Sequence, residues 1–168
     1  NVDDQDVGGC LRMLTELEQE EMAALDTACQ EEAGNRQSQR RLAEELTLLV
    51  HGESGLEVAR QATEIFFGAE IDNLNDAQLN QIFTDVPSQE CNRARLGDRS
   101  LTIVEALVET GLSKSKGEAR RTVQQGGAYV NNRRIQDIET PLTSEYLASE
   151  TVMVLRSGKK KYALMKFV

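Results

Sequence analysis

Apolar residues recur at helical spacing through the first half of the chain. Leu42, Leu46, Leu49 and Val50 follow one another at short helical intervals up to Gly52, and similar series precede and follow this stretch. Such spacing gathers apolar side chains on one helix face. The pattern predicts helices after Thr15, from about residue 37 to Gly52, from Ser54 to Gly68, and from Asn75 to Phe83. The first part of the chain is therefore expected to be all-helical.

The last 70 residues follow a different pattern. Thr102 and Ser115 are each followed three residues later by glutamate, which is the capping box that begins a helix. After Gly126-Gly127, runs typical of strands occur at 128–130, 133–135, 151–155 and 161–167. Asn131-Asn132 suits a tight hairpin turn, because asparagine tolerates a positive φ. Two short helices and a small sheet predict a compact α+β domain.

Residues 89–99 are polar and show no periodicity, which is typical of a linker. The sequence thus predicts a two-domain fold: an all-α helical domain at 1–88, a linker at 89–99, and a small α+β domain at 100–168.

Charge divides the chain near the same place. Residues 1–98 carry 21 acidic against 7 basic residues, a net of −14, and residues 99–168 carry 7 against 12, a net of +5; together they give the total of −9. A basic module next to an acidic one suggests a nucleic-acid-binding domain attached to a domain of another kind.

Cysteine and histidine usage restricts the chemistry. Cys10, Cys29 and Cys91 are odd in number and never form a Cys-x-x-Cys pair, which argues against a disulfide framework or a zinc site and fits the cytoplasm. His51 is the only histidine, and its place before Gly52 suits a helix end. We therefore expect no catalytic residues and no metal site in this chain. No apolar run approaches the roughly 18 residues of a membrane helix, so no contact with a membrane is expected.

Three basic clusters of the α+β domain are candidate phosphate contacts. They are Lys114, Lys116, Arg120 and Arg121; Arg133 and Arg134; and Arg156, Lys159, Lys160 and Lys161. The first begins a helix, where backbone N–H groups also attract phosphate. The alternative for each cluster is an ordinary solvated surface. Tyr129 and Tyr162 are candidates for base stacking or, alternatively, for packing within the sheet.

The run from Gly111 to Lys116, with Ala119-Arg120-Arg121, Gly126-Gly127 and Val130-Asn131, resembles the RNA-binding module named after ribosomal protein S-four. That module occurs in several families of RNA enzymes. Further segments narrow the resemblance: Asn1–Val7, Arg41–Glu45, Leu49–Gly52, Phe83–Ser88 and Gly158–Tyr162. Their order and spacing are similar to the C-terminal part of bacterial-type tyrosyl-tRNA synthetases along nearly the whole chain.

The resemblance implies a division of labour. Family members carry an N-terminal catalytic domain with HIGH and KMSKS signatures that binds ATP and tyrosine, and neither signature occurs here. We therefore expect a piece of a longer ligase that uses no cofactor of its own and forms no tyrosyl-adenylate. The partner would be tyrosine tRNA, and the parent protein would form a homodimer through the absent catalytic domain.

Site residues also carry over from the resemblance. The S-four-like domain would grip the long variable arm of the tRNA, and the matching positions include Lys116, Arg120, Arg156, Lys159 and Lys160. Many members have a basic residue where Gly117 and Ser157 stand, which implies either a lower affinity for the tRNA or compensation by Arg121 and Lys161.

The helical domain would face the anticodon side. A carboxylate can accept both donors of a guanine edge, so Asp3, Asp4 or Asp6 could read the anticodon; alternatively, Asp6 caps a helix. Arg36, Arg40 and Arg41 are the basic cluster of this domain.

Two other hypotheses stay open from the sequence. One is a stand-alone structured-RNA-binding or regulatory protein with the same module, which would have no reason to keep the synthetase-like helical segments. The other is an acidic protein-interaction domain with a basic, solubilising tail, which predicts no salt-sensitive RNA binding.

Overall fold

The computed structural model describes residues 2–168. The chain divides into two compact units, an N-terminal unit that ends at Arg60 and a C-terminal unit that begins at Gln61. The N-terminal unit is all-helical and the C-terminal unit contains the sheet, so the expected fold class is confirmed.

The N-terminal unit contains α1 (Asp4–Leu14), α2 (Gln19–Glu31) and most of α3 (Gln37–Phe66), with a 3₁₀ turn η1 (Ala33–Asn35) between the last two. The last six residues of α3 belong to the C-terminal unit. Asp3 caps α1, accepting a hydrogen bond from the backbone N of Asp4 at 2.8 Å. Thr15 ends α1 and does not begin a helix as the sequence predicted. Its hydroxyl donates to the carbonyl of Leu11 at 2.7 Å, so it serves the preceding helix instead.

The core of the N-terminal unit is small and aliphatic. Val7, Leu11 and Leu42 are buried, and Leu25 and Leu46 pack against them. The predicted helix end at Gly52 is confirmed, because this residue breaks α3 with a φ of 70°. The chain turns back there, which brings Arg60 Nη2 to 3.0 Å from Glu44 Oε2.

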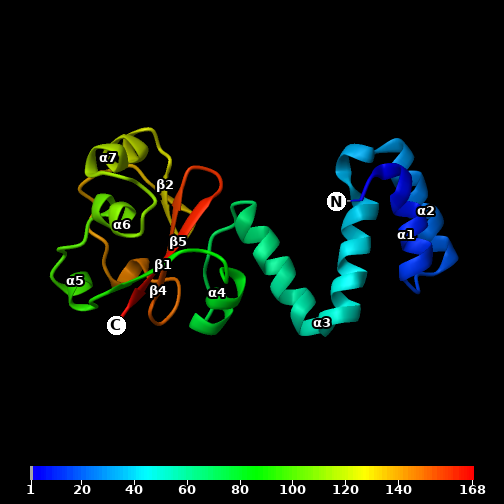
Figure 1. Cartoon of the computed structure of the whole chain (residues 1–168), viewed down its shortest axis with the longest axis horizontal. Coiled ribbons are helices and arrows are strands. Elements are labelled where there is room, and N and C mark those ends of the chain that lie inside the picture. The colour runs from blue at the N-terminus through cyan, green and yellow to red at the C-terminus, as the bar shows by residue number, and fades with distance from the viewer. Residues whose placement is uncertain (1) are drawn as a thin grey trace. The chain divides into compact units, whose positions relative to one another are not determined.

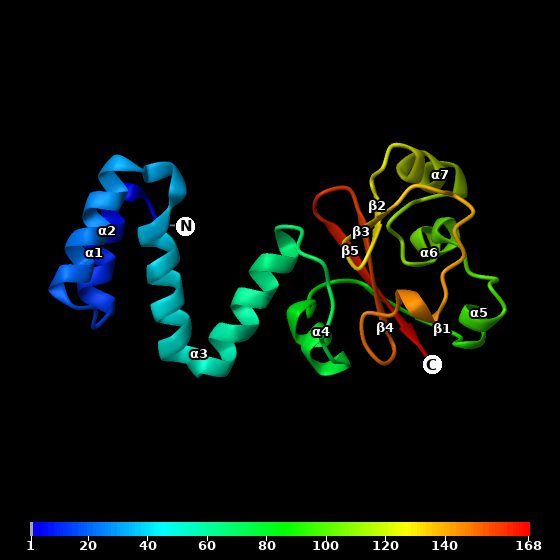
Figure 2. The same ribbon diagram turned by 180° about the vertical axis from the view of Figure 1, so that it is seen from behind.

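The C-terminal unit is a five-stranded sheet with helices on both faces (Figure 1). Its strands are β1 (Ser88–Cys91), β2 (Ala128–Val130), β3 (Arg133–Ile135), β4 (Val152–Ser157) and β5 (Lys161–Phe167), in the spatial order β1-β5-β4-β2-β3. The helices are α4 (Asp76–Ile82), α5 (Ala94–Gly97), α6 (Ile103–Glu109) and α7 (Lys116–Gln124), with a 3₁₀ turn η2 (Ser144–Tyr146) before β4. Figure 2 shows β3 next to β2 from the other side.

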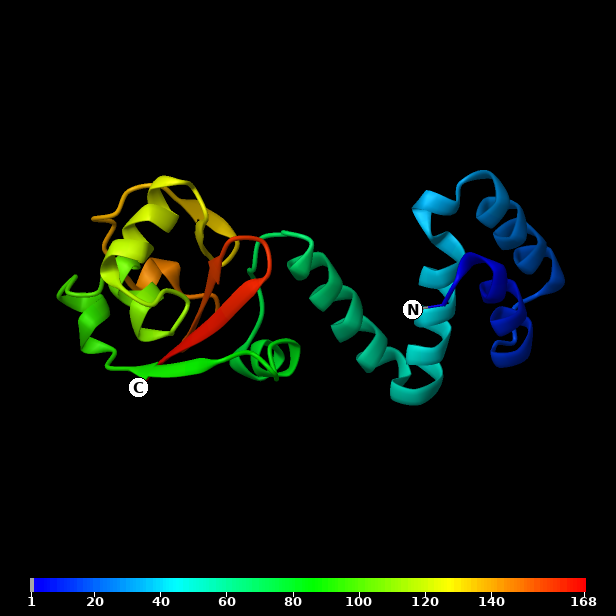
Figure 3. The same ribbon diagram turned by 45° about the horizontal axis from the view of Figure 1, so that its top comes forward.

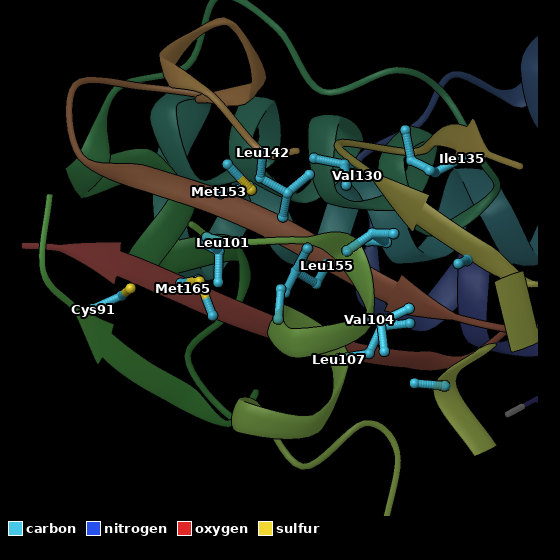
Figure 4. Close-up of a cluster of buried hydrophobic side chains, with 14 of the residues drawn as sticks. Cys91, Leu101, Val104, Leu107, Val130, Ile135, Leu142, Met153, Leu155 and Met165 are labelled. Atoms are coloured by element: carbon cyan, nitrogen blue, oxygen red, sulfur yellow. The ribbon is translucent and has the colours of Figure 1, made fainter. Parts of the chain in front are cut away.

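Alternation along β4 and β5 gives the sheet two cores. Met153, Leu155 and Met165 point to the face covered by α6 and α7, where they meet residues such as Leu101, Leu107 and Leu142 (Figure 4). Val152, Val154 and Leu164 point to the opposite face, where they pack with residues from the end of α3, the loop after it, and α4 with its C-cap: Ile65, Ile71, Leu79 and Phe83. Burial of both faces explains why the two strands read as nearly continuous apolar runs.

Local signals in the sequence of the C-terminal unit are confirmed. Thr102 forms the predicted capping box with Glu105, and Asn75 forms one with Gln78. Ser115 caps α7. Asn131 and Asn132 have φ values of 49° and 63°, as the predicted turn between β2 and β3 requires.

The structure corrects the expected linker at 89–99 and the domain boundary beside it. Residues 88–91 form β1, which pairs in parallel with β5 (Figure 3), and Leu96 of α5 is buried. An edge strand is held by backbone hydrogen bonds along one side, so the polar run Ser-Gln-Glu-Cys needs no apolar alternation. The stretch 61–88, assigned by sequence to the helical domain, packs instead in the C-terminal unit.

Two polar anchors fix this stretch to the sheet. The Asn132 amide donates to the carbonyls of Ile65 and Ala69, at 2.8 and 2.7 Å. Asp76, at the start of α4, accepts hydrogen bonds from the Ser149 hydroxyl and from both the backbone N and the hydroxyl of Thr151. Burial alone would raise the pKa of Asp76, but these hydrogen bonds outweigh it and hold the pKa below its usual value.

Candidate nucleic-acid interface

The start of α7 carries the first basic cluster. Ser115 accepts a hydrogen bond from the backbone N of Glu118, and the Glu118 carboxylate accepts one from the backbone N of Lys114 at 2.8 Å. This capping turns Lys114 and Lys116 outward at the helix start, and both are exposed. Arg120 and Arg121 are exposed one turn further along.

The β4–β5 hairpin brings the three lysines of the third cluster to α7. Its turn is tied to the turn after α7, because the backbone N of Gly158 donates to the carbonyl of Gly127 at 2.7 Å. Figure 1 shows α7 and the hairpin, coloured orange to red, at the same end of the sheet.

A hollow of about 490 Å³ lies at this junction, between the end of α7 and the hairpin, and a second of about 610 Å³ lies along α7. They share Thr122 and Gln125, so they form one continuous surface along α7 and the hairpin. Five of the predicted cations line it: Lys114, Arg121, Lys159, Lys160 and Lys161. We call these five residues, with Thr122 and Gln125, the basic surface. The structure thus joins two clusters that lie about 40 residues apart in the sequence.

Arg156 does not lie with the lysines that follow it in the sequence. It lies on the opposite face of the sheet from Lys161, with its Cζ 3.8 Å from the centre of the Tyr129 ring. Its Nη1 donates to the hydroxyl of Tyr162 at 3.4 Å. Tyr162 is only 6% exposed and packs edge-on to Phe66, which supports the packing alternative for that tyrosine.

The pair Arg133-Arg134 is engaged within the protein. Arg133 Nε donates to Glu70 Oε2 at 2.9 Å. Arg134 Nε donates to the carbonyl of Gly126 at 2.8 Å, which places a cation at the C-terminal end of α7, where the helix dipole favours it. Gly126 has a φ of 70°, and a Cβ there would collide with the Arg134 guanidinium. These contacts favour the structural alternative for this cluster.

One acid competes for the first cluster. Glu105 Oε1 accepts from Lys116 Nζ at 3.1 Å, while its other oxygen caps α6 through the backbone N of Thr102 at 3.2 Å. The hydrogen bond from Thr102 and then that from Lys116 lower the pKa of Glu105, so it is ionised at neutral pH. An RNA phosphate at Lys116 would therefore meet an existing carboxylate partner.

The N-terminal unit brings its two candidate groups together at the starts of α1 and α3. Asp4 accepts a hydrogen bond from the Gln39 amide, and Arg36 donates to the carbonyl of Val2 at 3.4 Å. Asp3 serves as the cap of α1, so the expectation that Asp6 is the cap is corrected; Asp6 is exposed in the first turn.

The arginines of that unit differ in their surroundings. Arg41 forms ion pairs with Glu21 at 2.8 Å and Glu45 at 2.7 Å, and the hydrogen bond to Glu21 is the main cause of its raised pKa. Arg40 is exposed. Arg41 is therefore committed to holding α2 against α3.

Comparison with known proteins identifies the family. A family model described as the tyrosine–tRNA ligase SYY-like C-terminal domain matches residues 78–165, just over half of the chain. The chain belongs to this family. The matched region contains all ten predicted RNA-binding residues, strands β1 to β4 and all but the last two residues of β5.

Curated tyrosine–tRNA ligases are similar over nearly the whole chain. Identity is 47% with the protein of Rhodopirellula baltica, 45% with that of Corynebacterium jeikeium and 42% with that of Geobacillus stearothermophilus. The alignments cover 97–99% of this chain but only 37–39% of the relatives, so the chain spans less than two fifths of their length. A solution structure of a tyrosyl-tRNA synthetase C-terminal domain aligns over 60% of this chain and 96% of its own, with 39% identity and a TM-score of 0.45.

The sequence did not predict that two uncharged side chains, Thr122 and Gln125, line the basic surface, or that Arg156 stacks on Tyr129. Thr122 and Gln125 sit where the two hollows meet, and their place follows only from the contact between α7 and the hairpin. The stacking of Arg156 on Tyr129 depends on the β2–β4 register, in which the two residues are direct partners. The alternation of side chains along a strand could have shown part of this. Once the turn between the two strands is placed, alternation puts Arg156 and Lys161 on opposite faces of the sheet.

Other classes of site find little support in the part of the chain that the structure describes. No group of three or more His, Cys, Asp or Glu side chains there could hold a metal ion. Within the same residues, no helix is long and apolar enough to cross a membrane.

Proposed function

We propose that this chain is the tRNA-binding region of a tyrosine–tRNA ligase and that it recognises tyrosine tRNA. The observation that carries the proposal is the basic surface: five cations from two distant segments form one face, in a chain of the tyrosine–tRNA ligase C-terminal family. Cations arranged along a surface release counterions from an RNA backbone, and this supplies much of the binding free energy.

The charge of the two units supports placing the main RNA contact on the C-terminal unit. Residues 1–60 carry 14 acidic against 5 basic residues, a net of −9, whereas residues 61–168 carry 14 of each. A neutral unit that gathers five of its 14 cations on one face attracts phosphate locally, and an acidic unit repels it over most of its surface. We assign the long variable arm to the basic surface and a limited anticodon-side contact to the N-terminal unit, near Asp6 and Arg40.

In the parent protein, the role of this region is to position the tRNA. A tRNA held at two places presents its terminal adenosine to an activated tyrosine with the right orientation, which lowers the entropic cost of the transfer. ATP and tyrosine bind to the catalytic part of the parent ligase, and this chain contributes neither a catalytic group nor a cofactor of its own. We place the parent ligase in the cytoplasm, as a homodimer formed through its catalytic part.

The test is binding of a tyrosine tRNA transcript to this chain across a salt series, beside the same tRNA with its variable arm trimmed. We expect binding that weakens steeply with salt and is lost on trimming. The double variant Lys159→Gln/Lys160→Gln should reduce the slope of log K against log salt by about 2. Arg93→Gln is the matched control, because Arg93 is exposed but follows β1 at the other end of the sheet.

Equal binding of both tRNAs would contradict the assignment of the variable arm and leave only a general phosphate surface. No binding at low salt would overturn tRNA recognition by this chain.

A further inference from the structure

The hollow of about 490 Å³ between the end of α7 and the β4–β5 hairpin contains no acidic side chain among the residues that the structure describes. We call it the lysine hollow, and its lining is Thr122, Gln125, Gly127, Ser157, Gly158, Lys159, Lys160 and Lys161. The neighbouring hollow along α7 includes Glu118, whose carboxylate accepts a hydrogen bond from the backbone N of Lys114. An anion in the lysine hollow therefore meets only positively charged side chains, in a chain that carries 28 acidic residues.

The three lysines of this hollow are available to an anion. All three are exposed, and none forms an ion pair within residues 2–168. They are consecutive, so neighbouring Cα atoms lie about 3.8 Å apart. Their flexible stems let the three ammonium groups approach one point. The hairpin turn thus supplies three unpaired charges to one small ligand.

The backbone around the lysine hollow does not oppose an anion. The C-terminal end of a helix carries partial negative charge on its carbonyls, which repels anions. At the end of α7, Arg134 donates to the carbonyls of Gly126 at 2.8 Å and Gln125 at 3.4 Å. The carbonyl of Gly127 accepts from the backbone N of Gly158 at 2.7 Å. These bonds offset the repulsion and fix the hairpin turn against α7.

Uncharged donors complete the lining. The Gln125 amide and the Ser157 hydroxyl are side-chain donors at the lysine hollow. Thr122 contributes differently, because its hydroxyl donates to the carbonyl of Glu118 at 3.1 Å. Three ammonium groups with two further donors suit an anion that has several oxygens and a high charge density.

A linear oligophosphate has these properties. At neutral pH, diphosphate and longer chains carry about three or more negative charges on adjacent groups, whereas an RNA strand carries one charge per nucleotide. A hollow lined by charge of one sign raises the local concentration of an oppositely charged ligand. Its volume of about 490 Å³ is in the range of small-molecule sites.

We propose that the lysine hollow binds oligophosphate, free or as the tail of a nucleotide, and that bound oligophosphate excludes tRNA from the basic surface. The competition rests on the proposed function, because the same three lysines contact the variable arm. The affinity for tRNA then falls as oligophosphate accumulates. Formation of an adenylate from ATP releases diphosphate, so the reaction of the parent ligase itself supplies a ligand of this class.

Calorimetric titration of this chain with tripolyphosphate at constant ionic strength tests the site. We expect one site per chain, with amide NMR shifts confined to the lining of the lysine hollow. Gln125→Glu places a carboxylate there and should weaken binding about tenfold. Gln89→Glu is the matched control, the same change at an exposed position of β1, and should leave binding unchanged. Equal weakening by both variants would assign the effect to net charge and overturn the site.

Titrations with other anions identify the recognised group. ATP should bind within about fivefold of tripolyphosphate, and AMP about tenfold more weakly, because the oligophosphate tail is the shared group. Binding of ATP without binding of tripolyphosphate would make the nucleoside the ligand and overturn the proposal. Sulfate that binds as tightly at the same ionic strength would reduce the site to general attraction of anions, which also overturns it.

Competition with tyrosine tRNA tests the regulatory part. At constant ionic strength, tripolyphosphate should raise the apparent Kd for tRNA as it fills the lysine hollow. Lys114→Gln, in the other hollow, should weaken tRNA binding and leave the affinity for tripolyphosphate intact. In Lys159→Gln/Lys160→Gln, the remaining tRNA binding should lose its sensitivity to tripolyphosphate. An unchanged affinity for tRNA when the hollow is filled would overturn the competition.

The proposed function and the oligophosphate site fail in different ways. If tRNA binds but tripolyphosphate does not, the oligophosphate site is wrong and the proposed function stands. If no tRNA binds at low salt, the proposed function and the competition are both wrong. The calorimetric titration then still decides whether the lysine hollow binds oligophosphate.

Discussion

The basic side chains of the C-terminal unit differ in whether an acidic side chain already forms an ion pair with them. Lys116 is paired with Glu105 and Arg133 with Glu70, whereas Lys159, Lys160 and Lys161 stand exposed on a hairpin turn. Pairing at exposed positions contributes little to folding stability, but an RNA phosphate must displace the carboxylate before it can bind. Exposure of a cation and its readiness to bind RNA are therefore separate properties here.

Glu105→Gln should strengthen tRNA binding. Glutamine can still accept the hydrogen bond of the capping box, so α6 keeps its start, while the negative charge beside Lys116 disappears. We expect the affinity to rise a few-fold, with a salt slope steeper by up to about 1.

Fluorescence anisotropy across a salt series measures this change, with thermal unfolding as a check on α6. Glu139→Gln, at an exposed acid before Pro141, serves as the control for general loss of negative charge. An affinity raised equally in both variants would assign the effect to net charge and not to Lys116.

Among the elements, α4 is attached to the segment before β4 through two carboxylates, because Asp76 accepts hydrogen bonds from that segment and its backbone N donates to Glu150 Oε2 at 3.3 Å. Asp76 receives hydrogen bonds from Ser149 and Thr151, and the helix itself has only seven residues. A helix this short is not stable by propensity alone, so its contacts with the sheet decide whether it forms.

Asp76→Asn should destabilise the C-terminal unit in a pH-dependent way. The pKa of Asp76 is lower in the folded than in the unfolded chain, so the carboxylate stabilises the fold above the unfolded pKa of about 3.9. That stabilisation is lost as the pH falls through the folded-state pKa. We expect a loss of about 1 kcal/mol at pH 7, because the asparagine amide cannot accept all three hydrogen bonds.

Urea unfolding at pH 7 and near pH 3 measures the effect, and the difference between variant and unmodified chain should shrink at the lower pH. Asp72→Asn, at an exposed acid of the same segment, should change little at either pH. A difference that persists unchanged near pH 3 would show that the charge of Asp76 is not its cause.

Over the whole molecule, the division of the chain follows packing and not charge or composition. Leu79, Ile82 and Phe83 look like the apolar face of one more helix in the helical half, yet they pack on the second face of the sheet. β1 joins the sheet through backbone pairing with β5, which the polar sequence of this strand does not predict. The capping residues and strands of residues 100–168 were predictable because their signals are local, whereas these two features arise from contacts between distant segments.

The features of the candidate site also fall into those that local sequence signals predict and those that depend on contacts between distant segments. Alternation and turn chemistry are enough to place the lysines at a hairpin turn, and composition is enough to mark the basic half. That Lys114 and Lys160 line one surface depends on how α7 meets the hairpin, for which the single sequence contains no local signal. The pairing of Lys116 with Glu105 likewise required α6 and α7 to be placed in space.

A chain of residues 61–168 should fold by itself, and one of residues 100–168 should not. The shorter piece lacks β1 and exposes the second face of the sheet, and each large side chain uncovered costs about 1.5–3 kcal/mol of burial. We expect cooperative thermal unfolding for 61–168, read by circular dichroism and dispersed amide NMR signals, and aggregation or dye binding for 100–168. A stable, cooperative 100–168 fragment would restore the boundary that the sequence predicted.

The strand order also governs when the sheet can be completed. β5 lies inside the sheet between β1 and β4, yet it is the last strand along the chain. On the ribosome, β1 emerges about 70 residues before its partner and must wait unpaired while the intervening helices and strands are made. The pairing that joins β1 to the rest is thus a late, non-local event, which slows folding and leaves a nascent edge open to wrong partners or to chaperones.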